Sequence, residues 1–325
     1  MKTLIRILMV FIGIGLPTLV QSQNADWPKS LTLATASPGG VYYVYGEAVA
    51  QILTENLKIT VNHLPTQGPV HNVKLVESGD AQLGMITMGV GLQGWNGTGD
   101  WTADKRYRKM RALFPMYDTP FQAVVLQRSG ISALAQLEQK RVGVGPRAGT
   151  GGTYVPVIMK ILGISTQISN GSFADMGSEL LSGRHDAIVT LTGAPLPAIQ
   201  EAGKREPITF ISLSSEQRDT IRKALPEFNS STIPAGTYPT LDKDYVTVGL
   251  YNFSIGRADL PDELVYQLVK AIYANHARLL KAHPTAAETV AQNADKNTFL
   301  PFHPGAIRYY QEVGIKIPDA LVPTN

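Results

Sequence analysis

The chain has 325 residues, of which 44% are hydrophobic and 17% are charged, and its formal net charge is +3. Length and composition of this kind indicate an ordinary folded protein of about two domains. A net charge this small gives no support for nucleic-acid binding, so we expect no nucleic-acid partner. The chain contains no cysteine, which excludes disulfides, thiolate metal sites, cysteine nucleophiles and a lipoprotein anchor.

The N-terminal segment has the pattern of a secretory signal peptide. Lys2 and Arg6 precede an apolar run at residues 7–20, and a polar segment with small residues follows. A small-x-small rule places cleavage after Ser22, with Ala25 as the second choice. The apolar run is shorter than the roughly 20 residues of a spanning helix, although an uncleaved anchor is the alternative. We therefore expect export to the periplasm and no membrane span after cleavage.

Beyond the signal, strand and helix patterns alternate along the chain, which is typical of an α/β fold. In chain order these patterns predict a strand at 31–35, a helix at 41–55, a strand at 59–64, a helix at 70–77, strands at 81–87, 111–115 and 121–126, a helix at 131–137, a strand at 141–145, helices at 152–162 and 174–181, strands at 186–191, 208–213 and 246–255, and a helix at 261–281. The segments 89–100 and 229–238 are predicted to be loops. Residues 116–120 are the point where the chain is predicted to cross from one α/β unit to the next, and the alternating pattern restarts after them. The sequence therefore predicts two α/β lobes with a cleft between them.

A glycine-rich loop at residues 141–153, with the sequence RVGVGPRAGTGGT, follows one predicted strand and opens a helix. Such a loop directs backbone N–H groups and the positive helix end at one spot, which suits an anion. It lacks the Gly-Lys-Ser/Thr of a phosphate-binding loop and the glycine spacing of a dinucleotide fingerprint. Arg147 and the hydroxyls of Thr150 and Thr153 instead indicate a small carboxylate. The alternative is a turn whose glycines serve geometry alone.

A similar strand, glycine turn and helix start occurs earlier, where Gly39 and Gly40 precede Val41. Two such starts in different lobes are predicted to face one ligand from opposite sides. Tyr42 and Tyr43 would add a ring wall and a phenol group. Packing in the core is the alternative for each tyrosine, and we expect it for one of the two.

The sequence contains no recognisable catalytic or metal-binding set. Its 6 histidines show no metal-ligand spacing, and there is no Gly-x-Ser-x-Gly elbow. Acidic pairs lie in polar, loop-like sequence. We therefore expect no enzymatic activity, no metal and no cofactor. Trp95 and Trp101 bracket the predicted loop 89–100 and would form either a lid over the cleft or a clamp that holds the loop.

The chain resembles the TAXI-type substrate-binding proteins of tripartite ATP-independent periplasmic (TRAP) transporters. Passages similar to that family follow in the right order over nearly the whole mature chain. They are the double-tyrosine opening at 39–46, the glycine loop at 141–153, Asp186-Ala187 followed by Gly193-Ala194-Pro195, and the closing stretch LPFHPGAIRYY at 300–310. The last passage is the most specific.

Two departures from the family pattern bear on the ligand. Residues 68–72 read Gly-Pro-Val-His-Asn where the family tends to read Gly-Ser-x-x-Asn, and residues 87–89 read Thr-Met-Gly where a Gln-x-Asp often follows the third strand. The missing amide and carboxylate would remove a partner for a ligand ammonium group. The departures favour an oxo-, hydroxy- or dicarboxylate, and an amino acid such as glutamate is the alternative.

The resemblance implies a type II periplasmic-binding-protein fold whose two lobes close on a small organic anion. After the predicted signal at 1–22, the chain then divides into lobe 1 at 23–118 and 248–325 and lobe 2 at 119–247, with hinges near 117–121 and 246–252. The closed protein, a monomer, would deliver its ligand to a TRAP membrane permease. A binding protein that serves a sensor and, more distantly, a secreted α/β hydrolase remain as alternatives.

The predicted site follows from the glycine loops and from this resemblance. Arg147 is expected to pair with a ligand carboxylate, and its replacement by Ala is expected to weaken binding at least tenfold. The remaining predicted site residues are Thr150, Gly151, Gly152 and Thr153 beside Arg147, Gly40, Val41, Tyr42, Asn72 and Thr87 from the other lobe, and Thr192 and Gly193 on the far wall.

Overall fold

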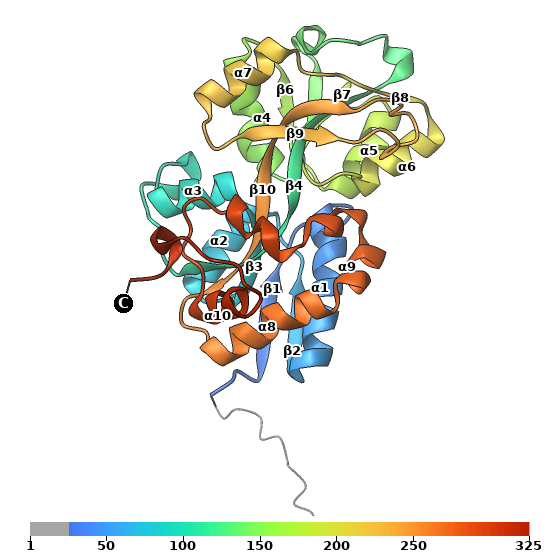
Figure 1. Cartoon of the computed structure of the whole chain (residues 1–325). Helices are drawn as coiled ribbons and strands as arrows, with labels where there is room; N and C mark the ends of the chain where they lie inside the picture. Colours follow the sequence, from blue (N-terminus) through green and yellow to red (C-terminus); the bar gives the residue numbers. More distant parts are fainter. Residues whose placement is uncertain (1–25, 325) are drawn as a thin grey trace, which may run out of the picture.

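The computed structural model describes residues 26–324, and the predicted signal peptide at 1–22 lies outside the described residues, as does Ala25. The described chain forms two lobes, one above the other in Figure 1, connected by two long strands. We call the lower lobe in this view lobe 1 and the upper one lobe 2. Within residues 26–324, no helix has both the length and the hydrophobicity that crossing a membrane requires.

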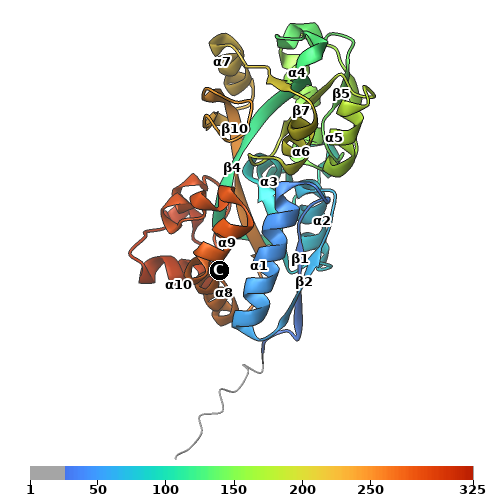
Figure 2. The ribbon, with the colours of Figure 1, turned by 90° about the vertical axis from the view of Figure 1, so that its right-hand side faces the viewer.

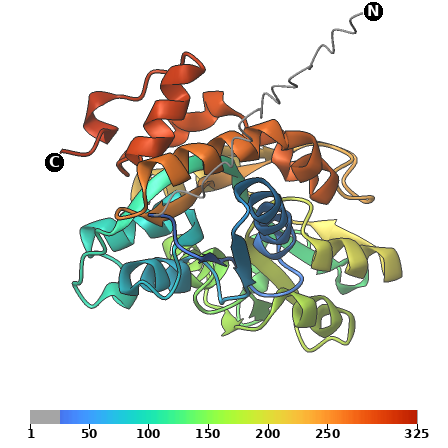
Figure 3. The ribbon, with the colours of Figure 1, turned by 90° about the horizontal axis from the view of Figure 1, so that it is seen from below.

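Lobe 1 is built on three parallel strands, with β1 paired to both β2 and β3. Its N-terminal elements are β1 (Ser30–Ala34), α1 (Val41–Leu57), β2 (Thr60–Leu64), α2 (Pro69–Ser78), β3 (Leu83–Thr87) and α3 (Met88–Asn96). Its C-terminal helices are α8 (Asp262–Ala274), α9 (His276–Ala282) and α10 (Pro304–Glu312). Figure 3 shows these orange and red C-terminal helices lying together along one side of the molecule.

Lobe 2 repeats the plan with the parallel strands β5, β6 and β7. Of these, β7 is buried along its whole length, as is typical of a strand covered on both faces. Its elements are β5 (Arg141–Gly143), α4 (Thr150–Ile161), β6 (Gln167–Ser169), α5 (Phe173–Leu181), β7 (Ala187–Leu191), α6 (Pro197–Arg205), β8 (Ile208–Phe210), α7 (Ser215–Ala224) and β9 (Asn229–Ile233). The short 3₁₀ segments of the described chain are Asp100–Thr102, Gln127–Ser129, Leu134–Leu137, Pro284–Glu288, Ala291–Lys296 and Asp319–Leu321.

The strands β4 (Met110–Leu126) and β10 (Tyr245–Arg257) run through both lobes, as Figure 2 shows from the side. They pair antiparallel from Gly249 opposite Pro120 to Arg257 opposite Met110. In lobe 1 β10 pairs with β3, and in lobe 2 β4 pairs with β7 and β8. The sheet order is β2-β1-β3-β10-β4-β7-β5-β6. The crossing predicted near 116–120 therefore lies within one continuous strand, while the predicted lobe boundaries and hinge motion remain predictions.

Two segments differ from their predicted structure because tertiary packing overrides local propensity. Most of the predicted loop 89–100 is the helix α3, whose Gly91 and Gly94 allow a very close approach of neighbouring side chains. A Cβ on Gly91 would lie 2.6 Å from Ile86 Cδ1, and one on Gly94 would lie 2.9 Å from Trp101 Cη2. The predicted loop 229–238 begins with β9, which pairs with β10.

The helix predicted at 131–137 was also too long, because only Leu134–Leu137 form a single 3₁₀ segment. Leu134 and Leu137 are buried, whereas most of the remaining segment is exposed. Without a further apolar turn to pack on the lobe, these few buried positions do not sustain an α-helix.

Candidate ligand-binding site

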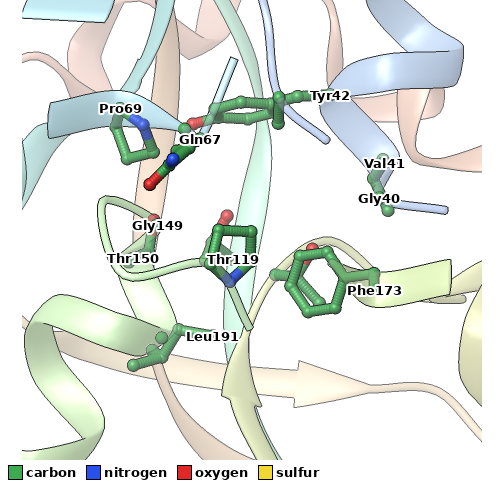
Figure 4. A pocket seen from close by; sticks show the side chains of 15 residues that line it. Gly40, Val41, Tyr42, Gln67, Pro69, Thr119, Gly149, Thr150, Phe173 and Leu191 are labelled. Carbon is green, nitrogen blue, oxygen red and sulfur yellow. The ribbon is translucent and has the colours of Figure 1, made fainter. Parts of the chain in front are cut away.

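A small cavity lies between the lobes, beside the place where β4 crosses from one to the other. Its volume is about 30 Å³, so in this arrangement of the lobes only a small ligand fits. Figure 4 shows Tyr42, Gln67 and Pro69 on one side and Thr150, Phe173 and Leu191 on the other. The full lining is Ala36, Gly40, Val41, Tyr42, Gln67, Gly68, Pro69, Thr119, Pro146, Gly149, Thr150, Gly151, Phe173, Leu191 and Thr192.

The helices α1, α2 and α4 all begin at this cavity. Their N-cap residues are Gly40, Gly68 and Gly149, and none of these caps has a side-chain hydrogen bond. The first N–H groups of a helix have no partner within the helix, and its N-terminal end carries partial positive charge. The start of α2 has fewer free N–H groups, because the helix begins with a proline and the Val70 N–H donates to Ala148 O at 3.1 Å. The anion-binding capacity therefore resides mainly in α1 and α4.

The hydroxyl groups on the lobe 1 side of the cavity are held by one buried amide, that of Asn252 on β10. The Tyr42 hydroxyl donates to Asn252 Oδ1 at 2.6 Å. Asn252 Nδ2 donates to Tyr117 O at 2.6 Å and to Thr119 Oγ1 at 2.5 Å. Burial raises the pKa of Tyr42 well above its ordinary value, so the phenol stays protonated near neutral pH. The positions of the Tyr42 and Thr119 oxygens are thus fixed by a side chain from a distant part of the chain.

None of the side chains that line the cavity is charged. Arg147, from which we expected a direct contact with the ligand, is exposed, although Pro146 and Gly149 on either side of it line the cavity. The lining therefore offers N–H groups, hydroxyls and apolar surface. Such a lining can bind an anion through dipoles but has no carboxylate with which to balance a cation.

The lobes touch around the cavity, which places the structure in a closed arrangement. Besides the bond from Val70 to Ala148, Thr87 Oγ1 and Thr150 Oγ1 lie 3.2 Å apart across the cleft. A Cβ on Gly68 would lie 2.9 Å from Gly149 Cα, and one on Gly39 would lie 2.6 Å from Ala174 N. Glycine at these positions therefore lets the two lobes approach each other this closely.

The structure brings about half of the predicted site residues together and leaves the others outside the cavity. Those that line it are Gly40, Val41, Tyr42, Thr150, Gly151 and Thr192. Those outside its lining are Asn72, Thr87, Arg147, Gly152, Thr153 and Gly193.

The residues outside the lining have structural contacts of their own. The Asn72 amide donates to Thr35 O, directly after β1, and to Met85 O in β3, so it ties these two neighbouring strands together. Thr153 Oγ1 donates to Gly149 O within its own helix. A Cβ on Gly152 would lie 2.4 Å from Pro146 O, and one on Gly193 would lie 2.8 Å from the Tyr117 ring. Both glycines are therefore required by close packing.

Sequence reasoning missed several residues of the lining, above all Gln67, Thr119 and Phe173. Thr119 lies within the segment 116–120, where the chain was predicted to cross between the lobes. A residue at this crossing lies beside the cleft, so its position in the sequence could have identified it. Phe173 starts α5 and packs on the glycine loop, where a Cβ on Gly145 would lie 2.9 Å from its ring. No local pattern distinguishes this phenylalanine from an ordinary core residue.

Of the aromatic residues with two open interpretations, Tyr42 lines the cavity, whereas Tyr43, Trp95 and Trp101 do not. The Tyr43 ring packs edge-on against the His63 ring. Trp101 Nε1 donates to Gln93 Oε1, and the Arg108 guanidinium covers the Trp95 ring at 4.2 Å. Neither tryptophan is part of the cavity lining, so both stabilise α3 and the segment after it rather than cover the ligand site.

Solved structures with this architecture are periplasmic solute-binding proteins. MatC from Rhodopseudomonas palustris, with bound malate, matches with a TM-score of 0.60 at 10% identity, over 88% of this chain and 97% of that chain. The alkanesulfonate-binding protein SsuA from Xanthomonas axonopodis pv. citri, bound to MOPS, matches with a TM-score of 0.51 at 13% identity, over 88% and 85%. A periplasmic transporter structure matches with a TM-score of 0.55 at 11% identity, over 88% and 98%.

At such low identities these matches show the fold alone. The chain has the fold of periplasmic solute-binding proteins, which confirms the predicted α/β fold class. The model of the NMT1-like family matches residues 33–314, and the chain therefore belongs to the NMT1-like family.

Proposed function

We propose that this protein is a periplasmic solute-binding protein that captures a small organic carboxylate between its lobes. One observation carries the proposal: the glycine-capped starts of α1 and α4 meet at an interlobe cavity whose lining has donors but no charged side chain. The malate bound to MatC, a protein of the same fold, is an organic acid of this general class.

The chemistry of binding follows from the groups in the lining. The carboxylate accepts hydrogen bonds from the N–H groups of Thr150 and Gly151 and from the hydroxyl of Thr192. Each such charge-assisted bond contributes about 1.5–3 kcal/mol. Ligand between the lobes stabilises the closed arrangement by its higher affinity for that state. An ammonium group would enter without any carboxylate beside it, which disfavours an amino acid such as glutamate.

The proposed partner is the permease of a TRAP transporter, and this rests on the resemblance to TAXI-type proteins. The signal-like sequence at 1–22 supports a periplasmic location, where a monomer would shuttle between free ligand and permease. We propose no catalytic role and no metal or cofactor. The gene neighbourhood distinguishes a permease partner from a sensor.

The proposal is tested by a melting screen of purified mature protein against organic acids, amino acids and sugars. The protein is first unfolded and refolded, so that ligand acquired during production is removed. A ligand that binds only the native state stabilises it by about 2.7 kcal/mol at a hundredfold excess over its Kd. We expect a dose-dependent rise in Tm with small carboxylates, and a rise with sugars or amino acids only would contradict the proposal.

A pair of threonine variants tests the location of the site. Thr192→Val removes a hydroxyl from the lining and is expected to weaken carboxylate binding about tenfold, which is about 1.4 kcal/mol. Thr153→Val removes a hydroxyl that donates to its own helix and serves as the matched control. Equal affinities of the two variants would argue against this cavity as the binding site.

A further inference from the structure

The amide of Asn252 has only one orientation that satisfies its neighbours. The carbonyl oxygen of Tyr117 lies 2.6 Å away and can only accept, so the amide nitrogen must face it. The amide oxygen then faces Tyr42 at 2.6 Å and requires that the phenol donates. Asn252 is completely buried, so solvent cannot replace either bond.

The Tyr42 oxygen consequently acts as an acceptor toward the cavity. Its single proton is committed to Asn252, and burial keeps the phenol protonated by raising its pKa. What remains on the oxygen is lone-pair density at the cavity wall, where Tyr42 is one of the lining residues. Any ligand group that contacts this oxygen favourably has to carry a proton.

Thr119 has the complementary character. Asn252 Nδ2 donates to its hydroxyl oxygen at 2.5 Å, which leaves the Thr119 proton for another acceptor. In the described part of the chain no acceptor for this proton is found, and Thr119 lines the cavity. One buried amide thus turns two neighbouring hydroxyls into a donor and an acceptor.

We propose that the ligand is a short monocarboxylate that also carries a hydroxyl, and that this hydroxyl donates to the Tyr42 oxygen. The inference rests on the function proposed above. The carboxylate binds at the start of α4 and the hydroxyl faces Tyr42, while Asn252 acts as a positioning residue. A single charge and a short chain follow from the uncharged lining and the small cavity volume of about 30 Å³.

Acids of the same size with other substituents fit this arrangement less well. The oxygen of an oxo acid would face the Tyr42 oxygen with no proton between them, so both lose hydration without compensation. An unsubstituted acid leaves the acceptor unpaired. An amino acid provides a proton but brings a positive charge that no side chain of the lining balances.

The test compares lactate, pyruvate, propionate and alanine by titration calorimetry on refolded protein at pH 7. We expect lactate to bind at least tenfold more tightly than the other three compounds. In Tyr42→Phe the ratio of lactate to pyruvate affinity should fall to within about twofold. Tyr45→Phe is the matched control, because this buried hydroxyl bonds Thr289 Oγ1 at 2.9 Å and Tyr45 is outside the lining. It should keep the wild-type preference.

The outcomes separate this inference from the proposed function. If pyruvate or propionate binds as tightly as lactate, or only longer acids bind, the hydroxyl assignment is overturned while carboxylate capture stands. A preference for lactate that survives in Tyr42→Phe would overturn the role of Tyr42, provided that the variant melts cooperatively. If no carboxylate of any length binds, both the inference and the proposed function fail.

Discussion

The charge of the proposed ligand is met by backbone dipoles rather than by a cation. Arg147 occupies the loop before α4, but the inner side of that loop packs on the Phe173 ring, which would lie 2.9 Å from a Cβ on Gly145. The guanidinium is left exposed, where water screens its charge. We therefore expect this residue to contribute only a weak long-range attraction to binding.

Arg147→Ala is accordingly expected to change carboxylate affinity by less than about twofold, because an exposed charge contributes little. This reverses the tenfold loss that the sequence alone suggests. Titration of the variant with its best carboxylate at low and physiological salt checks the expectation. A loss of tenfold or more at physiological salt would mean that the side chain turns into the cleft when ligand binds.

The helix starts explain how the two lobes meet so closely. Gly39 precedes α1, has a φ of +81°, and its Cβ position lies 2.6 Å from the backbone nitrogen of Ala174 on α5. This glycine therefore has two roles, a left-handed turn and a contact between lobes. Gly130 shares the first role, with a φ of +68°, but nothing lies within 4 Å of its Cβ position.

The two glycines provide a matched test of closure. Gly39→Ala and Gly130→Ala should each lose about 1 kcal/mol of stability to backbone strain. Only Gly39→Ala should also weaken ligand binding, by tenfold or more, because its methyl group pushes the lobes apart. Equal binding by both variants would show that the approach of α1 to α5 is not needed for the bound state.

The sequence was sufficient to predict those features of the site that depend only on residues close together in the chain. The glycine turns before α1 and α4 could be identified from the sequence, and six predicted site residues, near these turns and directly after β7, line the cavity. Asn72 was expected at the site from the family resemblance, and in the structure its amide donates to Thr35 O and Met85 O outside the cavity lining. Thr119 and Asn252 could not be paired, because their contact joins strands more than 130 residues apart in sequence.

At the scale of the whole molecule, the β4 crossing separates two openings. Along a strand, successive side chains point to opposite faces. Thr119 lines the ligand cavity, whereas Asp118 and Pro120 line a groove of about 550 Å³ on the other face. In this groove Asp118 accepts a hydrogen bond from Ser231 of β9, and Glu288 accepts one from the Asp118 N–H at 3.2 Å.

The acidic pair in the groove gives the protein a defined pH dependence. Burial raises the pKa of Asp118 to about 6, and burial together with the Asp118 charge raises that of Glu288 to about 7. Because both pKa values are higher in the folded state, the folded protein binds more protons between about pH 4 and pH 7. These groups therefore lower stability as pH rises through that range, by up to about 1.4 kcal/mol per pH unit and proton.

Asp118→Asn should remove the part of this pH-dependent loss of stability that is due to Asp118. It should also remove the negative charge that raises the pKa of Glu288. The gain in Tm of the variant over the wild type is expected to grow from pH 4.5 to pH 7.5. Comparing variant with wild type cancels the opposite trend from buried histidines such as His283, whose pKa burial lowers. Asp186→Asn is the control, because Arg141 lowers the pKa of Asp186. A Tm difference independent of pH in Asp118→Asn would refute the assignment.

The most direct test of the central claim is a crystal structure of refolded protein with the carboxylate that binds most tightly. We predict density for the acid between the lobes, with its carboxylate against the N–H groups of Thr150 and Gly151 and no cationic side chain in contact. Density in the groove beside Asp118, or a carboxylate paired with Arg147, would contradict the account.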